Sequence, residues 1–294
     1  MLLMGTGLLW GTIGISGRMI FERSDLNAFQ VSWLRTMFAT PFCLLIGMRM
    51  VGPKLFRIPP RDFGILSVLT IGIYSSQASY LIGVDQIGVS VATLICLCSI
   101  PVMVTLYSVV VQGEHLTGAL TVALIGAVIG TAMVTLSDGG SSGNGTVVAG
   151  VAAALFAGAT GAMYNLGSRA FVQRYHPITA LALGFPVNLI VFAFVMRGAD
   201  IGSLSLTVWL LLLYLGVGTQ GIAYLMFQWG LQTESATVAS IMSLLEPVTA
   251  AFLAWVLLGE TLGWIGLIGS GLLLAALILL TVSPQRAVLD ESAG

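Results

Sequence analysis

The stretches SIPVMVTLYSVVVQGE (residues 99–114) and LLEPVTAAFLAWVLLGE (residues 244–260) repeat one pattern: a proline inside an apolar run and, twelve positions later, the pair Gly-Glu. A shift of 146 positions places Pro101 on Pro247 and the two Gly-Glu pairs on each other without a gap. The second stretch alone has an acid, Glu246, directly before its proline. Because glycine ends helices and an acid favours a helix N-terminus, we expect Gly-Glu to separate two helices in each copy.

The composition indicates a membrane protein. Of the 294 residues, 57% are hydrophobic and 8% are charged, and the mean hydropathy is +1.01. Soluble domains carry about 25% charged residues, so this chain lacks the polar side chains that a water-exposed surface needs. The net charge of −1 provides no basic patch. We therefore expect a lipid bilayer around the chain and no nucleic-acid partner.

Apolar runs of about 20 residues, the length that spans a bilayer, recur along the whole chain. Ten of them are expected as transmembrane helices, near residues 2–21, 28–48, 63–83, 90–112, 117–137, 146–168, 178–197, 207–230, 236–258 and 262–283. The predicted fold is an all-α integral membrane protein with a first five-helix repeat (1–139), a second five-helix repeat (146–284) and a short tail (285–294). No cleaved signal peptide is expected, since the first apolar run begins at Met1.

Five helices per repeat is an odd number, so the second repeat is expected to enter the membrane from the opposite side. Inverted repeats are typical of alternating-access transporters, which bind their cargo near the midplane between the halves. Lys and Arg mark the cytoplasmic side. With the N-terminus inside, the inner loops and tail collect Arg49, Lys54, Arg57, Arg61, Arg169, Arg174 and Arg286. The outer side collects Arg23 and Arg197, with Arg18 close by, so both termini are expected in the cytoplasm.

Glu246 is the one acid expected deep in the membrane, at the centre of its span. A charge there costs at least ~2.5–3.5 kcal/mol, so the side chain should face the interior, be paired, or be protonated. Pro101 and Pro247 are expected to kink their helices. Two interpretations of Glu246 stay open: a site for a proton or a substrate amine, or a neutral carboxyl bonded to backbone that the proline frees.

Arg35 is the other ionisable group at depth. It lies roughly 10 Å inside the outer end of its helix, at 1.5 Å per residue. Arg35 could pair with a substrate carboxylate or with Glu246, or it could extend its charged end outward to water. The sequence favours a structural role.

Polar and aromatic side chains recur on one face of two predicted helices. One face begins at Tyr74, and its further members follow at every third position. The other face begins at Tyr214, and its further members follow after seven, three and four positions. Such faces suit a small amphipathic solute, because tyrosine combines an apolar body with a polar tip and glutamine meets both ammonium and carboxylate groups. Hydrogen bonding between helices is the alternative. The candidate cavity residues are Trp10, Gln77, Tyr80, Tyr164, Asn165, Tyr224, Gln228 and Glu246.

The sequence contains no residue set for intramembrane catalysis or ATP binding. Its two histidines, His115 and His176, lie at membrane edges outside any H-E-x-x-H motif, and no G-x-x-x-x-G-K-[ST] motif occurs. The spacing of Cys43, Cys96 and Cys98 matches no zinc, haem or redox pattern. We expect neither an enzyme nor a metal or cofactor; coupling to protons stays open.

The chain resembles the drug/metabolite transporter superfamily, and the EamA family within it best. The resemblance rests on the ten spans in two halves, on Trp10-Gly11 in the first helix, and on the string EPV…GE that ends at Glu260. The overall layout is similar to that of YddG-like bacterial amino-acid exporters. The first half departs from the pattern, with isoleucine before Pro101, so any role of Glu246 is not duplicated.

The resemblance implies a secondary transporter of the bacterial inner membrane that exports small metabolites by alternating access. Aromatic or neutral amino acids are the first candidates; drugs, nucleosides or sugars are the alternative. A channel or an intramembrane enzyme is a different class, which the inverted repeat and the missing catalytic set disfavour. Helices 1, 3, 4, 6, 8 and 9 are expected to surround a central cavity. A monomer is favoured over a homodimer, for which Gly126 and Gly130 offer a small-residue face.

Overall fold

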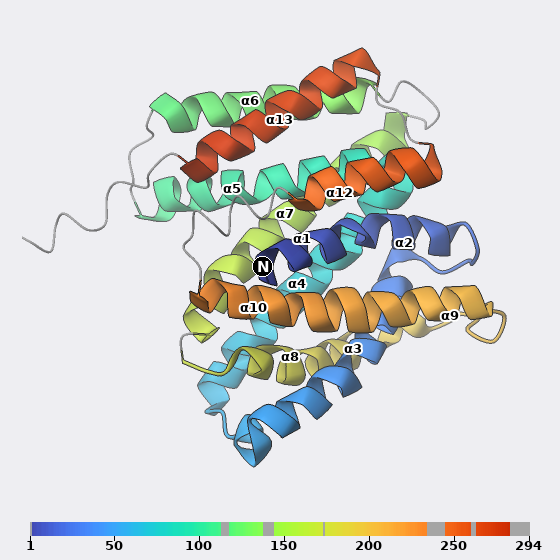
Figure 1. The fold of residues 1–294 in the computed structure, drawn as a ribbon, viewed down its shortest axis with the longest axis vertical. Helices are drawn as coiled ribbons and strands as arrows, with labels where there is room; N and C mark the ends of the chain where they lie inside the picture. Colours follow the sequence, from blue (N-terminus) through green and yellow to red (C-terminus); the bar gives the residue numbers. More distant parts are fainter. Residues whose placement is uncertain are drawn as a thin grey trace, which may run out of the picture.

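The computed structural model describes residues 2–112, 118–137, 144–172, 174–233, 245–259 and 263–282, and every regular element within them is a helix (Figure 1). The first half contains α1 (Leu2–Gly11), α2 (Ile13–Phe21), α3 (Ala28–Met50), α4 (Pro60–Ile87), α5 (Val89–Gln112) and α6 (Gly118–Ser137), with a short 3-10 helix at Gly52–Phe56. The second half contains α7 (Asn144–Val172), α8 (Pro177–Val191), a 3-10 helix (Ala193–Met196), α9 (Leu206–Leu213), α10 (Ala223–Thr233), α12 (Leu245–Leu253) and α13 (Trp264–Val282). Each of the ten expected spans overlaps at least one of these helices.

Several helices have the length, and the outer helices have the apolar surface, that a bilayer requires. Among the described residues, four helical segments are long and apolar enough to cross a membrane by themselves: Ala28–Met50, Pro60–Ile87, Thr146–Tyr164 and Leu206–Gly230. Large apolar side chains remain exposed on the outer helices, for example Val128, Ile190 and Trp264. In a bilayer these side chains contact lipid rather than water.

The first expected span is two helices rather than one. The main-chain N–H of Thr12 donates to Leu9 O at 3.2 Å, and the Thr12 hydroxyl donates to the same oxygen at 2.7 Å. A hydroxyl bound to a preceding carbonyl competes with the regular helical hydrogen bonds and bends the chain. The span expected near residues 2–21 is therefore present but interrupted at Thr12.

Two further spans contain π-helical segments that the sequence pattern did not indicate. Tyr214–Ile222 joins α9 to α10, and Ala254–Leu258 follows α12. A π-helix places about one extra residue in a turn and shifts the faces on either side of it. In the span 206–233 this segment lies next to the candidate site.

The helices of the two halves pair reciprocally. Numbered by span, helix 3 (α4) packs on helix 6 (α7), and the counterparts, helix 8 (α10) and helix 1 (α1), also pack on each other. The same holds for α5 with α7 and for α12 with α1. The self-related pairs, α6 with α13 and α3 with α8, lie near opposite ends of the molecule in Figure 1. The contacts thus follow a twofold exchange of the halves.

Gly126 and Gly130 make contacts inside the chain. A Cβ on Gly130 would lie 2.9 Å from Gly269 O and 2.8 Å from the Leu273 side chain, so α6 approaches α13 backbone to backbone. Gly126 faces Leu272 and Ala276 of α13 at ordinary contact distances. Close packing of α6 on α13 inside the chain accounts for both glycines.

Candidate functional site

A cavity of about 80 Å³ lies between helices of both halves. This volume has room for several water molecules, at roughly 10–15 Å³ each. We call it the central cavity; its lining residues are Trp10, Ile13, Ile73, Ser76, Gln77, Tyr80, Cys96, Leu97, Ile100, Gly161, Tyr164, Tyr224 and Glu246. They come from α1, α2, α4, α5, α7, α10 and α12. These helices belong to the six spans, 1, 3, 4, 6, 8 and 9, that were expected around a cavity.

The structure brings six of the eight candidate residues together on this cavity: Trp10, Gln77, Tyr80, Tyr164, Tyr224 and Glu246. Gln228 is absent from the lining and is 0% exposed; its Nε2 donates to the Tyr164 hydroxyl at 3.1 Å. Gln228 therefore positions a wall residue from behind. The side chains of Asn165 and Pro101 lie outside the described residues.

Three aromatic rings form one wall of the central cavity. The Trp10 and Tyr224 ring centroids are 4.9 Å apart, and Tyr164 meets Tyr224 edge to face at 6.3 Å. Trp10 is fixed in addition by its indole N–H, which donates to Thr219 O at 3.1 Å. Such rings offer an apolar surface and hydroxyl groups at the same place.

Glu246 supplies the only acidic side chain in the cavity lining. It is half-buried, and no hydrogen bond or ion pair joins its carboxyl to another side chain in the described part of the protein. Gly11 permits its position, because a Cβ there would lie 2.9 Å from Glu246 O and 2.6 Å from Thr249 Cβ. Residues 234–244 lie outside the described part, so the kink at Pro247 stays a prediction.

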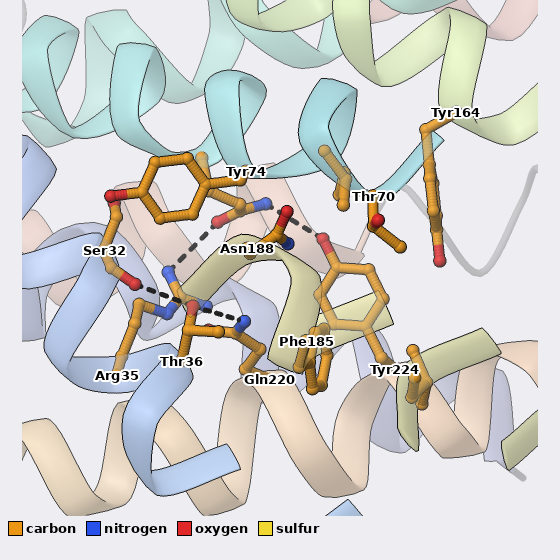
Figure 2. Close-up of a pocket in the computed structure, with 13 residues that line it drawn as sticks. Ser32, Arg35, Thr36, Thr70, Tyr74, Tyr164, Phe185, Asn188, Gln220 and Tyr224 are labelled. Carbon is orange, nitrogen blue, oxygen red and sulfur yellow. Dashed lines mark hydrogen bonds between the residues drawn. The ribbon is translucent and has the colours of Figure 1, made fainter. Parts of the chain in front are cut away.

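Arg35 lies behind the cavity wall. Its guanidinium is 0% exposed, so outward extension to water is wrong. Nη1 donates to Gln77 Oε1 at 3.1 Å, and Nη2 donates to the Thr219 hydroxyl at 3.2 Å. Gln77 in turn donates from Nε2 to the Tyr224 hydroxyl at 3.0 Å. Figure 2 shows this chain of side chains from Arg35 to Tyr224. It connects the arginine to the cavity through neutral groups.

Arg35 and Glu246 form no ion pair with each other. Among the described residues, ion pairs join only Glu22 to Arg18 and Arg23. Arg35 lines a second, smaller pocket, which does not include Glu246. The two charged groups thus lie on separate pockets that share the wall of Gln77 and Tyr224.

The π-helical segment makes this network possible. Gly216 lies so close to α3 that a Cβ would meet Arg35 O at 2.4 Å and Phe38 Cβ at 2.6 Å. The close approach brings Thr219 and Gln220 against α3, where Gln220 Nε2 donates to the Thr36 hydroxyl at 2.9 Å. π-Helical turns inside α-helices are frequent at functional sites.

Two tyrosines of the expected faces do not line the cavity. The Tyr74 hydroxyl donates to Phe29 O at 2.8 Å, and its ring stacks on Phe192 at 4.0 Å. The Tyr214 hydroxyl lies 2.7 Å from the Thr12 hydroxyl near the surface. Tyr214 begins the π-helical segment, and the extra residue per turn separates it from the face of Tyr224.

Sequence reasoning missed several lining residues. Ile13, Ile73, Leu97 and Ile100 are apolar residues in apolar spans, so no signal distinguished them from lipid-facing positions. Ser76, Cys96 and Gly161 complete the lining. Gly161 carried a usable signal, since a small residue one turn from Tyr164 leaves room beside the ring.

The site can hold a small molecule with an apolar body and polar ends. Aromatic and aliphatic walls contact the body, Gln77 and the tyrosine hydroxyls offer hydrogen bonds, and Glu246 offers a negative charge. The described residues contain no group of three His, Cys, Asp or Glu side chains that could hold a metal ion. The arrangement is suited to binding.

Comparison with known proteins agrees with this architecture. Residues 1–136 and 147–282 each match the EamA-like transporter family. The chain is similar to an uncharacterized inner membrane transporter, YicL, of Salmonella typhimurium, with 25% identity over 95% of this chain and 93% of the relative. It is also similar to the uncharacterized transporter YwfM of Bacillus subtilis, with 29% identity over 74% of this chain and 73% of the relative.

Further similarity is found to an uncharacterized transporter of Clostridium kluyveri, with 24% identity over 87% of this chain and 84% of the relative. A solved crystal structure shares the fold with a TM-score of 0.67 at 19% identity, covering 97% of this chain and 96% of that one. The expected all-α membrane fold of about ten helices, with two family repeats, is confirmed. The chain belongs to the EamA-like transporter family, and it is a multi-pass membrane transporter rather than an enzyme.

Proposed function

We propose that this transporter is a secondary active exporter of small metabolites, with aromatic or neutral amino acids first, and that it works by alternating access. The central cavity carries the proposal. Residues of the first half (Trp10, Gln77 and Tyr80) and of the second half (Tyr164, Tyr224 and Glu246) line one space. When two halves move against each other, a space between them opens alternately to the two sides of the membrane.

The reciprocal helix pairing supports an inverted repeat. The contacts of α4 with α7 and of α10 with α1 are related by exchange of the halves, as are those of α5 with α7 and of α12 with α1. Five spans per half place the two halves in opposite orientations. The units are residues 1–139 and 146–284, with Pro101 and Pro247 as bending points of related helices.

We place both termini in the cytoplasm of a bacterium and the chain in its inner membrane. The excess of Lys and Arg in the loops assigned to the inside supports this orientation. YicL, a relative similar over most of both chains, is described as an inner membrane transporter. We propose a monomer as the working unit.

An amino acid fits the lining chemically. The carboxylate of Glu246 can receive an ammonium group or a proton, and the rings of Trp10 and Tyr224 can contact a side chain. Gln77 can meet either end of a zwitterion. Drugs, nucleosides or sugars are the second candidate cargo, since stacked rings and amides also bind them.

Counterflow in proteoliposomes tests the proposal. Vesicles with purified protein are loaded with an unlabelled amino-acid mixture and receive one labelled amino acid outside; vesicles without protein are the control. The proposal expects transient accumulation of label that related amino acids abolish. Uptake equal to the control for every amino acid would reject the amino-acid cargo, and the same vesicles would then test nucleosides and sugars.

A further inference from the structure

Arg35 is a buried cation without a carboxylate partner in the described part of the protein. Its side chain is 0% exposed, and its two hydrogen-bond acceptors, Gln77 Oε1 and Thr219 Oγ1, are neutral oxygens. The third nitrogen, Nε, has no hydrogen-bond partner. Buried charges in proteins are normally paired with an opposite charge, because unpaired burial is costly. Arg35 therefore lacks the anion that would balance it.

The small pocket at Arg35 contains two more unpaired polar atoms. Ser32 Oγ and Asn188 Oδ1 are buried without a hydrogen-bond partner, and each residue is 1% exposed. Ser32, Arg35 and Asn188 all line this pocket, which we call the arginine pocket (Figure 2). Since most buried polar atoms are hydrogen-bonded, three exceptions around one space indicate a polar occupant. The pocket has a volume of about 10 Å³, room for roughly one water molecule in this conformation.

Gln77 separates the arginine pocket from the central cavity. It lines both spaces, together with Ile73, Tyr164 and Tyr224. Its amide oxygen points at the guanidinium and its amide nitrogen at the Tyr224 hydroxyl. Toward Arg35, the Gln77 amide oxygen occupies a place that a carboxylate oxygen would take, with the same geometry but without the charge.

We infer that Arg35 binds the carboxylate of the cargo, which replaces the Gln77 amide at the guanidinium and draws on the free Arg35 Nε and Ser32 Oγ. This inference rests on the proposed transport site and narrows its cargo to molecules with a carboxylate. The exchange is favourable because a charge-assisted hydrogen bond replaces a neutral acceptor. In the absence of cargo, the Gln77 amide oxygen keeps the cation partly satisfied.

Two substitutions of Gln77 have opposite predicted effects. Gln77→Glu has almost the same shape and supplies a permanent carboxylate, which competes with that of the cargo. Gln77→Met removes the neutral acceptor and adds no charge. The probes are three compounds with the same phenylethyl body: phenylalanine, phenethylamine without the carboxylate, and 3-phenylpropionate without the amine. Their apparent affinities are measured on purified protein by ligand-induced shifts of the melting temperature.

Both proteins are measured in the same chloride buffer. We expect the affinity of Gln77→Glu for phenylalanine and for 3-phenylpropionate to be lower than that of the wild type by about tenfold or more. Gln77→Met should bind them as well as the wild type or better. Phenethylamine has no carboxylate and should not bind more weakly to Gln77→Glu than to the wild type; its binding also shows that both variants are folded. Arg35→Met should lose the preference for phenylalanine over phenethylamine.

Other outcomes overturn the inference. The first is that the wild type and Gln77→Glu bind phenylalanine with equal affinity. The second is that chloride raises the melting temperature of the protein as much as 3-phenylpropionate does at the same concentration. The third is that neither carboxylate compound binds. The proposed function is tested separately. If phenethylamine shows counterflow as strong as that of phenylalanine, the chain transports amines, and the carboxylate site at Arg35 is rejected. If no compound shows counterflow but carboxylates bind through Arg35, the transport proposal fails and the inferred site remains.

Discussion

The indole nitrogen of Trp10 lies 3.1 Å from the main-chain oxygen of Thr219, although the two residues are 209 positions apart. Thr219 also receives Arg35 Nη2 on its side-chain oxygen at 3.2 Å. One residue of the π-helical segment thus positions both an aromatic wall of the central cavity and the cation behind that wall. It also joins the first helix of one half to the third helix of the other.

Trp10→Phe tests this contact. Phenylalanine keeps a ring next to Tyr224 but cannot donate to Thr219 O, so the variant should lose about 0.5–1.5 kcal/mol of stability. Thermal unfolding in detergent measures the loss. Trp255→Phe, at a position that is 61% exposed on the outer surface, is the matched control and should unfold like the wild type. Equal losses in both variants would contradict a specific role of the Trp10 hydrogen bond.

Arg35→Met should separate stability from function. Methionine fills much of the same space, and the unfavourable burial of an unpaired cation is removed, so the melting temperature should equal or exceed that of the wild type. Counterflow of amino acids should fall by about tenfold or more, since a charge-assisted bond is lost. A variant that unfolds at much lower temperature and retains transport would show that Arg35 is structural.

Glu246→Gln should abolish proton-driven uphill transport and leave counterflow exchange in place. The amide keeps the size and hydrogen-bonding capacity of the side chain but cannot take up or release a proton. Transport is measured in proteoliposomes with and without an imposed pH gradient, over a series of external pH values. If the pH dependence of the variant equals that of the wild type, Glu246 does not couple protons and has a structural role.

Cys96 offers a direct probe of the central cavity. It lines the cavity, whereas Cys98 is 2% exposed in a core cluster and its thiol donates to Leu273 O. A small methanethiosulfonate reagent should modify a protein with Cys96 alone about tenfold or more faster than one with Cys98 alone, since access limits the reaction. Serine replaces the other cysteines. Cargo added before the reagent should protect Cys96; equal rates at both positions would argue against a solvent-accessible cavity.

Much of the fold could be predicted because lipid imposes simple rules. Apolar runs of spanning length located the helices, and the two copies of the proline and Gly-Glu pattern located the repeat. The break at Thr12 and the π-helical segment at Tyr214–Ile222 depend on local hydrogen bonds and on the close approach of Gly216 to α3. Neither leaves a periodic signal in the sequence.

The site could be predicted only where a residue is unusual for its surroundings. Gln77 and Glu246 are polar groups in apolar spans, and both line the cavity. Tyr74 and Gln228 carried the same signal but bond to Phe29 O and the Tyr164 hydroxyl instead. A polar residue in a membrane helix must find a partner, and the sequence does not say whether that partner is protein or cargo.

Counterflow in proteoliposomes containing Gly161→Phe, with Gly161→Ala beside it, tests most directly the claim that cargo binds in the central cavity. A Cβ at Gly161 would lie 3.4 Å from Ser76 Oγ and 3.6 Å from Ile100 Cδ1, which are ordinary contacts, whereas a phenyl ring would fill the space. Both variants are first checked for a single folded species by size-exclusion chromatography. The account predicts that Gly161→Ala transports amino acids like the wild type and that Gly161→Phe, though folded, does not. Wild-type counterflow by folded Gly161→Phe would contradict it.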